Sequence, residues 1–184
     1  PSCWSRSQEY AERAEPFPTE HPEWCRKVVP ITDFEPEMEK INRKLGKEGH
    51  ALMIIEELIG GRLYTGPLYH KYNHVLRAKS GNPFICDMYK KMCKDNMYPT
   101  TIHAINSLII KLSKLTMATK VFRGFCYARL PDTFWTANEF GVKGGVESAF
   151  MSTTLNSEVA MVYAAGNGSR MGIAIEVQQG MVNR

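Results

Sequence analysis

The spacing of hydrophobic positions changes near Thr116 and divides the sequence into two parts. Before this point, apolar residues recur three and four positions apart, which places them on one face of a helix. The pattern predicts helices over residues 51–59, 67–79, 83–95 and 100–115. The last is the most regular, with apolar residues at Ile105, Leu108, Ile109, Leu112 and Leu115. We therefore expect it to be a core helix.

Capping residues and glycines predict where the helices begin and end. Asp33 is expected to cap the first helix, with Pro36 in the first turn, where no backbone N–H is needed. The region of Gly46 and Gly49 is expected to end this helix. The pair Gly60–Gly61 is expected to close the next one.

Beyond Thr116 the apolar runs shorten and glycines become frequent. Strands are predicted over residues 121–127, 148–154 and 171–177, with a helix over 157–165 between the last two. A helical half followed by strands is typical of an α+β domain. The four prolines among the first thirty residues indicate an arm or linker. We expect this arm over residues 1–34 and the α+β domain over residues 35–184.

Composition and charge argue against two kinds of partner. The chain of 184 residues has 23 basic and 19 acidic residues, a formal net charge of +4, and no block of Lys and Arg. No nucleic-acid partner is therefore expected. No run of about 18 apolar residues is present, so no membrane span is expected either.

The cysteines bear on the cellular compartment. There are five of them, an odd number, and none shows the CxxC spacing of metal sites. This pattern predicts free thiols in a reducing environment rather than a disulfide framework. It favours a cytoplasmic location over a secreted one, and no metal site is expected.

One charge interrupts a short apolar run, KVFRGFC, which otherwise has the pattern of a buried strand. The charge is Arg123, and a guanidinium is costly to bury unless it meets an anion or several acceptors, because it cannot lose its proton. Either Arg123 lies at a strand edge facing water, or it faces a phosphate or a carboxylate. The strand alone leaves both interpretations open.

Three further patterns could carry chemistry. Tyr69, Asn73 and Arg77 follow one another at steps of four, so they form one polar stripe on a helix, which is either a binding surface or an ordinary solvated face. The run FMSTT at residues 150–154 places three hydroxyls at a strand end. Tyr163 lies on the following helix, where an aromatic residue belongs either to the core or to a stacking site.

The order of these patterns resembles that of the mono-ADP-ribosyltransferases of the arginine, serine, glutamate type. An arginine in VFRG is followed about thirty residues later by Ser-Thr-Thr, then by the helix SEVAMVYAAG and the strand GIAIEV. The segment YTGPLYHKYNHVLR is similar to the helix of this family in which two tyrosines and an asparagine face the NAD site. The superfamily includes vertebrate-like arginine-specific enzymes and binary bacterial toxins. The resemblance covers residues 51–184.

The resemblance implies a fold and an activity. The expected fold is α+β and ADP-ribosyltransferase-like, with a helical N-terminal half packed on two small mixed β-sheets that form an NAD cleft. The expected reaction transfers ADP-ribose from NAD to a side chain of an acceptor protein, arginine above all, and releases nicotinamide. Its transition state resembles an oxocarbenium ion, so the site must hold the pyrophosphate and the nicotinamide and place negative charge beside the developing cation.

The resemblance also assigns residues of the strand half. Arg123, with the adjoining Gly124, is expected to hold the phosphates, so that the counter-anion of the buried charge is a ligand. Ser152 is expected to position the catalytic glutamate by a hydrogen bond, which makes Arg123 and Ser152 the expected catalytic residues. Thr154 is expected to support the strand and to contribute to NAD binding.

The remaining assignments concern aromatic and amide side chains. Tyr64, Tyr69 and Asn73 are expected to line the NAD cleft, and Tyr163 is expected to stack near the nicotinamide ring. In this assignment the stripe of Tyr69 and Asn73 is a binding surface rather than a solvated face.

The chain departs from the family at its end. The family's catalytic pair, Glu-x-Glu, lies on a strand after the segment that corresponds to GIAIEV, and the sequence stops at Arg184 before that position. Glu176 alternates with Ile173, Ile175 and Val177, so it is expected on the polar side of a core strand and not in a catalytic role. We therefore expect an incomplete enzyme, which is truncated, disordered beyond its end, or completed by another chain.

Two alternatives to a transferase remain open. In an NAD glycohydrolase, water would replace the acceptor side chain. A non-enzymatic module would keep the fold and bind NAD or a protein.

Overall fold

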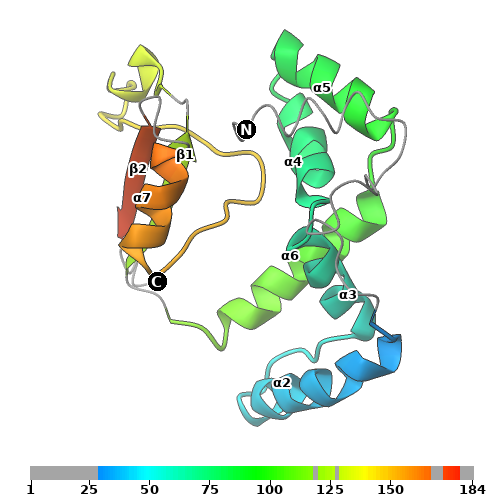
Figure 1. The fold of residues 1–184 in the computed structure, drawn as a ribbon. Coiled ribbons are helices and arrows are strands. Elements are labelled where there is room, and N and C mark those ends of the chain that lie inside the picture. The colour runs from blue at the N-terminus through cyan, green and yellow to red at the C-terminus, as the bar shows by residue number, and fades with distance from the viewer. Residues whose placement is uncertain (1–28, 118–119, 127–128, 167–171, 179–184) are drawn as a thin grey trace. The chain divides into compact units, whose positions relative to one another are not determined.

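The computed structural model describes residues 29–117, 120–126, 129–166 and 172–178 (Figure 1). They form an α+β protein with six α-helices and one two-stranded antiparallel sheet among the described residues. In chain order the elements are η2 (Ile31–Phe34), α2 (Glu35–Lys47), α3 (Ile55–Tyr64), α4 (Tyr69–Ala78), α5 (Pro83–Cys93), α6 (Pro99–Ser113), β1 (Lys120–Cys126), η3 (Asp132–Phe134), α7 (Ser157–Ala165) and β2 (Gly172–Gln178).

The chain divides into two compact units after Met117. Residues 29–117 make up the helical unit, and the described residues from 120 to 178 make up the sheet unit. The division coincides with the change of hydrophobic spacing near Thr116. Most of the arm expected over residues 1–34, namely residues 1–28, lies outside the described residues.

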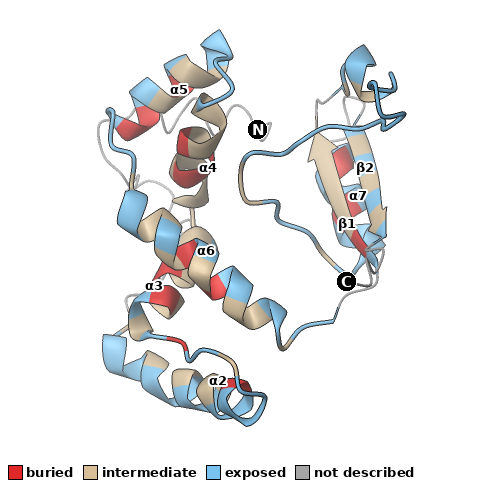
Figure 2. Ribbon diagram, turned by 180° about the vertical axis from the view of Figure 1, so that it is seen from behind, coloured by how far each residue is buried: buried red, intermediate tan, exposed pale blue. Residues whose placement is uncertain are grey.

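Two apolar clusters form the core of the helical unit. One contains the buried residues Leu45, Met53 and Leu108, from α2, the segment before α3, and α6. The other contains Val75, Met88, Met92 and Cys93, where α4 packs on α5. Figure 2 shows buried residues on one side of each of these helices, as expected for helices with one apolar face.

Helices α4, α5, α6 and α7 confirm the helices predicted over residues 67–79, 83–95, 100–115 and 157–165. In α6, Ile105 and Leu108 are buried as expected for a core helix, whereas Ile109 is 46% exposed. Helix α5 begins where the Asn82 side chain accepts hydrogen bonds from two backbone N–H groups of its first turn.

The prediction for the second helix was wrong at both ends. Residues 51–54 are extended, and α3 continues through Gly60–Gly61 to Tyr64. These two glycines lie where α3 crosses α6: a Cβ on Gly60 would be 3.3 Å from the Cβ of Ala104, and one on Gly61 would overlap the Leu108 side chain. The glycines therefore permit close helix packing and do not terminate the helix.

The predicted cap of the first helix was also wrong. Asp33 lies within η2, where its N–H donates to the carbonyl oxygen of Pro30, and α2 begins at Glu35 without a side-chain cap. A tight 3-10 turn thus precedes the helix and moves Asp33 out of the capping position. Pro36 lies in the first turn of α2 as predicted, and the helix ends at Lys47, between the two glycines expected to end it.

The sheet pairs β1 with β2 so that Arg123 lies opposite Ile175 and Gly124 opposite Ala174. Residues that face each other across the sheet point to the same side, and successive residues alternate. One face therefore carries Arg123 among apolar residues from both strands, namely Val121, Phe125, Ile173, Ile175 and Val177.

Helix α7 packs on the other face of the sheet, as Figure 1 shows within the sheet unit. Its Ala160 and Ala164 are buried against the strands. A Cβ on Gly124 would overlap the Ala160 carbonyl oxygen, and a Cβ on Gly172 would overlap the Ala164 carbonyl oxygen. Small residues on both sides thus bring the helix backbone directly onto the strands.

The strand predicted over residues 148–154 is not formed. Only Thr154 pairs with the sheet, through two backbone hydrogen bonds with Phe122 of 2.8 and 2.9 Å. Residues 151–153 are exposed, and the chain enters α7 soon after Thr154. A strand needs a neighbour along its length, and the pairing with β1 ends after this single bridge. The second sheet is therefore not present among the described residues.

The sequence predicts no membrane span and free cysteine thiols, and both predictions can be compared with the described residues. Within the described ranges, no helix has the length and apolar character needed to cross a bilayer. Cys86, Cys93 and Cys126 are free thiols, as predicted. The other two cysteines, Cys3 and Cys25, lie outside the described residues.

Candidate functional site

Strand β1 holds Arg123 at its centre on the apolar face of the sheet, where the residue is half-buried. Its guanidinium carbon lies 4.7 Å from the centre of the Phe125 ring, which is two residues along and so on the same face. Its Nη1 donates to the carbonyl oxygen of Ser152 at 3.2 Å. The guanidinium is thus held by an aromatic ring and a backbone acceptor.

The segment that carries Ser152 is tied to both β1 and α7. Thr154 pairs with the Phe122 backbone, and its Oγ1 accepts from the Asn156 N–H at 3.1 Å. The Asn156 side chain in turn accepts from the N–H of Glu158 at 2.8 Å and caps α7. This chain of hydrogen bonds fixes the start of α7 relative to β1 and leaves Ser152 exposed beside Arg123.

Arg123 and the backbone of Ser152 are in direct contact, although only Thr154 of the segment that carries Ser152 pairs with β1. The contact uses the backbone carbonyl of Ser152, so it holds the segment and not the hydroxyl group. That the Ser152 hydroxyl positions a catalytic glutamate by a hydrogen bond stays a prediction.

Gly124 and Tyr163 lie on the α7 side of the sheet. A Cβ on Gly124 would be 2.9 Å from the Cβ of Tyr163, as well as overlapping the helix backbone. Because neighbouring strand residues point to opposite faces, the Arg123 side chain leaves the sheet on the side away from α7. Tyr163 is 65% exposed. Tyr163 therefore lies on the side of the sheet opposite to the Arg123 side chain, and its contact with nicotinamide stays a prediction.

Glu176 also belongs to the α7 side of the sheet, since it lies opposite Phe122. Its Oε1 is 2.8 Å from the Lys120 Nζ, and both side chains are about half exposed. On β2 it alternates with half-buried Ile173, Ile175 and Val177, which confirms the predicted alternation. Its carboxylate is engaged by Lys120 and leaves the sheet on the face opposite to Arg123.

Of the three predicted residues of the helical unit, Tyr64 and Tyr69 meet at the start of α4, and Asn73 lies about one turn further along the helix. The rings of Tyr64 and Tyr69 meet edge to face with centres 6.3 Å apart, and the Tyr69 ring lies 3.9 Å from that of His70. Asn73 is 4% exposed, and its Oδ1 has no hydrogen-bond partner among the described residues. At Asn73 the predicted stripe is therefore buried, so it is not an ordinary solvated face.

Two histidines flank this stripe in neutral form. Burial, with the nearby charges of His74 and Arg77, lowers the pKa of His70 to about 4. Burial also lowers the pKa of His74, and Arg77 adds to this effect, whereas the hydrogen bond between Nδ1 and the His70 carbonyl oxygen opposes it. Near neutral pH the two histidines thus add no positive charge to this stretch of α4.

Sequence reasoning missed three contributors to these arrangements. Phe125 stands two positions after Arg123, so strand alternation could have placed it beneath the guanidinium. Asn156 directly precedes the predicted helix, and asparagine is a preferred cap. The burial of Asn73 had no local signal in the sequence.

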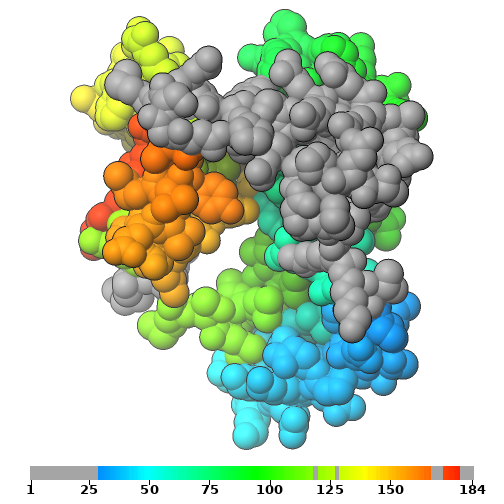
Figure 3. Space-filling model, in the orientation of Figure 1, coloured from blue at the N-terminus to red at the C-terminus, as the bar shows by residue number. Residues whose placement is uncertain are grey.

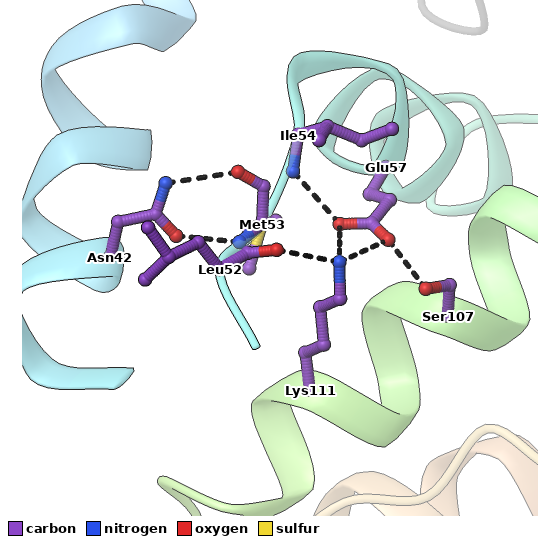
Figure 4. A network of polar contacts seen from close by, with 7 residues as sticks. All are labelled: Asn42, Leu52, Met53, Ile54, Glu57, Ser107 and Lys111. Atoms are coloured by element: carbon purple, nitrogen blue, oxygen red, sulfur yellow. Dashed lines mark hydrogen bonds and ion pairs between the residues drawn. The ribbon is translucent and has the colours of Figure 1, made fainter. Parts of the chain in front are cut away.

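The most buried charged group of the described chain lies elsewhere, in the helical unit (Figure 4). Glu57 is 3% exposed, and its carboxylate accepts from the Lys111 Nζ at 2.7 and 2.9 Å, from Ser107, and from the Ile54 N–H at 3.0 Å. Lys111 also donates to the carbonyl oxygen of Leu52 at 2.7 Å. These contacts join α3 to α6.

The Glu57 cluster is structural. Burial alone would raise the pKa of Glu57, but the hydrogen bonds from Lys111, Ser107 and the Ile54 N–H, together with the Lys111 charge, outweigh burial and hold the pKa below its ordinary value. Next to it, the Asn42 side chain makes hydrogen bonds of 2.9 and 2.6 Å with the backbone of Met53. The carboxylate is thus saturated by partners that fasten the extended segment before α3.

A shallow open hollow beside α2 is lined by Glu39, Asn42, Arg43 and Leu52 and includes none of the predicted site residues. Within the part of the chain that the structure describes, no group of three or more His, Cys, Asp or Glu residues could hold a metal ion. The described residues thus define an α+β protein with a cationic centre on a small antiparallel sheet. Comparison of the chain with protein-family models, curated proteins and solved structures found no match.

Proposed function

We propose that this chain is an NAD-binding domain of the mono-ADP-ribosyltransferase type, which transfers ADP-ribose from NAD to a side chain of an acceptor protein, with arginine as the expected acceptor, and releases nicotinamide. The observation that carries the proposal is the contact between Arg123 on β1 and the Ser152 segment. The resemblance to the mono-ADP-ribosyltransferases leads us to expect these two residues in one catalytic site. We also propose that the fold is ADP-ribosyltransferase-like, with a second small sheet and an NAD cleft.

Arg123 suits a pyrophosphate ligand. Its guanidinium cannot lose its proton, and its planar fork can donate two parallel hydrogen bonds to phosphate oxygens. The Phe125 ring on one side and the Ser152 carbonyl oxygen on the other hold it in one orientation, which lowers the entropy lost on binding. Ser152 is exposed next to this group, where a ribose or a catalytic acid would approach.

Asn73 supports the proposal from the helical unit. A buried acceptor without a partner is costly, on the order of 1–3 kcal/mol, and such groups often mark functional positions. Its Oδ1 would accept from an N–H donor, which both the carboxamide of nicotinamide and the amino group of adenine provide. Tyr64 and Tyr69 remain the proposed aromatic contacts to NAD beside it, and on the sheet unit Gly124, Thr154 and Tyr163 remain proposed with Arg123.

Calorimetric titration with NAD tests the central assignment. We expect Arg123→Ala to weaken NAD binding at least tenfold, or about 1.4 kcal/mol, and Arg123→Lys to recover little, because a point charge cannot repeat the two-pronged contact. Arg129→Ala is the matched control: it removes the same charge from an exposed pair with Asp132 on a loop. Equal NAD affinities for wild type and Arg123→Ala, with both proteins folded, would defeat the assignment.

One observation bears on whether residues 1–184 complete the reaction alone. Glu176 is the only acid on β2, and it pairs with Lys120 on the face away from Arg123. A reaction through an oxocarbenium-like state loses on the order of 3 kcal/mol or more, at least a hundredfold in rate, without a carboxylate beside the ribose. We therefore expect residues 1–184 to bind NAD without appreciable release of nicotinamide or labelling of an arginine-rich protein. Robust nicotinamide release that Glu176→Gln abolishes would show that Glu176 is the catalytic acid.

A further inference from the structure

Strand β2 has one edge that pairs with none of the described residues, and we call it the open edge. The other edge of β2 pairs with β1, and the sheet of the described residues contains only these two strands. The far edge of β1 differs, because the Phe122 backbone exchanges two hydrogen bonds with Thr154 there. Figures 1 and 2 show β2 at the outer margin of the sheet unit, and Figure 3 shows its atoms, in red, at the surface beside α7.

The bridge at Thr154 determines which backbone groups of β2 point to the open edge. Along a strand in an antiparallel sheet, the N–H and C=O groups of successive residues point to opposite edges. Those of Phe122 point to Thr154, so those of Arg123 point to β2 and pair with Ile175. By the same alternation, the residues of β2 whose N–H and C=O groups point outward are Gly172, Ala174, Glu176 and Gln178.

The open edge has few of the features that usually protect an edge strand. Such strands are often very short or carry proline, lysine or a bulge, because a row of unpaired N–H and C=O groups binds another strand. Strand β2 has seven residues in regular register with β1, and its only charged residue is Glu176. Ala174 and Glu176 are exposed. An extended chain can therefore reach the outward-pointing groups.

We propose that the open edge binds β2 of a second copy of this chain, in an antiparallel pair about a twofold axis. A twofold interface requires a surface that matches itself. Ile175 is the middle residue of β2, so the register with Ile175 at the axis pairs all seven residues. In this register Ala174 faces the partner subunit's Glu176, and Ile173 faces the partner subunit's Val177. The two small sheets then form one sheet of four strands.

The side chains agree with this register. Facing residues of adjoining strands lie on the same side of a sheet. Ile173, Ile175 and Val177 are half-buried on the face that carries Arg123, so the register joins two apolar rows into one. On the other face each Glu176 meets an alanine, whereas a register centred on Glu176 would place two carboxylates opposite each other. One strand pair is a small interface, so the dimer is weak and reversible. It does not depend on NAD binding.

Charges at position 174 test the register. Sedimentation equilibrium of the 184-residue chain, between about 5 and about 500 µM, measures the association constant. Ala174→Lys places a cation opposite Glu176 on both sides of the axis and should raise this constant about fivefold, whereas Ala174→Glu should lower it about fivefold. Both variants should fold, because Ala174 is exposed. Ala174→Gln, the uncharged control, should associate like wild type, and salt at about 1 M should remove both differences.

Cysteines in β2 test the position of the axis. Ile175→Cys should give a covalent dimer on mild oxidation, because facing residues of a pair without hydrogen bonds have Cα atoms about 4.5 Å apart, within disulfide range. Ile173→Cys changes the same face of the same strand and is the matched control. Its two copies would lie four residues apart along the paired strands, more than about 10 Å, so it should give no covalent dimer. Wild type, oxidised in the same way, controls for the native thiols.

Three results would overturn the proposal. The first is a chain that stays monomeric over the whole concentration range. The second is a dimer whose association constant Ala174→Lys and Ala174→Glu change in the same direction or leave unchanged. The third is a dimer that Ile173→Cys cross-links as well as Ile175→Cys does. The charge variants decide the matter even if a cysteine variant does not fold, because they leave the apolar face of the sheet intact.

Discussion

The helical unit and the sheet unit bury their residues in different ways. The helical unit contains most of the buried apolar residues of the described chain, including Leu45, Met53, Val75, Met88, Met92, Ile105 and Leu108. In the sheet unit the buried apolar residues are Val121, Ala160 and Ala164. Seven large apolar residues of the sheet unit are instead more than 60% exposed, namely Trp135, Phe140, Val142, Val146, Leu155, Val162 and Tyr163.

The polar contacts differ in the same way. In the helical unit, Glu57 is buried and fully engaged by Lys111 and its neighbours, so one interior charge cluster fastens two helices and the segment before them. In the sheet unit, the charged group on the apolar face is Arg123, and the segment beside it is held by one bridge at Thr154. The helical unit thus has its charged cluster buried between two helices, whereas the sheet unit has a half-buried arginine on the apolar face of its sheet.

This contrast indicates how each unit is stabilised. A two-stranded sheet is marginal alone and needs a packed partner. Here that partner is α7, and its packing depends on the absence of side chains at Gly124 and Gly172. The helical unit has two apolar clusters of its own and tolerates local changes better. Single substitutions should therefore break one unit and leave the other folded.

The largest effect is expected from Gly124→Ala. The new methyl group would overlap the Ala160 carbonyl oxygen, and backbone cannot move aside as a side chain can, so α7 must leave the sheet. We expect a loss of about 4 kcal/mol in the free energy of unfolding of the sheet unit. Amide hydrogen exchange measured by mass spectrometry should show fast exchange in β1 and β2 and unchanged protection in α6.

Gly46→Ala is the control for this substitution. A Cβ on Gly46 would lie 3.6 Å from the Leu52 side chain, an ordinary contact, and alanine favours helix more than glycine does. This variant should gain about 0.5–1 kcal/mol in stability. Full protection of β1 and β2 in Gly124→Ala would show that the strands do not depend on α7.

The next largest effect is expected from a substitution in the helical unit, which should leave the sheet unit folded. Lys111→Met leaves the Glu57 carboxylate buried without its charged partner and should cost the helical unit about 3 kcal/mol near neutral pH. The exposed pair of Lys91 and Asp87 provides the control, because Lys91→Met should change stability by less than about 0.5 kcal/mol. Urea denaturation followed by circular dichroism measures both.

The free energy of unfolding should depend on pH with opposite signs in wild type and in Lys111→Met. In wild type the pKa of Glu57 is lowered, so its stabilising contribution is present above the ordinary carboxyl pKa and is lost as the pH falls through the lowered value. In Lys111→Met, burial acts with less opposition, so we expect the pKa of Glu57 to rise. As the pH falls from about 7 to about 4, the free energy of unfolding of Lys111→Met should therefore come closer to that of wild type. Equal losses for Lys111→Met and Lys91→Met would contradict a structural role for the buried pair.

The sequence predicted helices better than strands for a physical reason. A helix closes its own backbone hydrogen bonds, so its periodic apolar residues report it locally, and α7 was predicted with both ends correct. A strand needs a neighbour, and the FMSTT segment has the composition of a strand, yet within the described ranges only its Thr154 pairs with β1. Gly60–Gly61 was interpreted by local propensity, whereas its role depends on α6, which lies about forty residues away in the sequence.

The candidate site was predictable in part. The contact of Arg123 with the Ser152 segment followed from the order of motifs, and the position of Glu176 followed from strand alternation. The face on which Tyr163 lies could not be predicted, because it depends on α7 packing against Gly124. Burial of Asn73 was equally hidden, since a stripe of polar residues looks the same in sequence whether it is solvated or covered.

Asn73 gives the smallest expected effect and the sharpest test of whether the helical unit also serves a ligand. Asn73→Leu removes a buried acceptor that has no partner and replaces it with an apolar group of similar size. We expect a gain of about 1 kcal/mol in the free energy of unfolding, since the cost of an unpaired buried polar group disappears. The same variant should bind NAD more weakly, as expected where a residue is kept for function at the expense of stability.

Asn106→Leu, on the exposed side of α6, is the matched control. It makes the same change of helix propensity, worth a few tenths of a kcal/mol, without removing a buried acceptor. Subtracting its effect from that of Asn73→Leu isolates the contribution of the unpaired Oδ1. If Asn73→Leu proves less stable than Asn106→Leu, the oxygen is satisfied in solution and Asn73 is a structural residue. If it is more stable and its NAD affinity falls, the helical unit, like the sheet unit, carries a group held for a ligand.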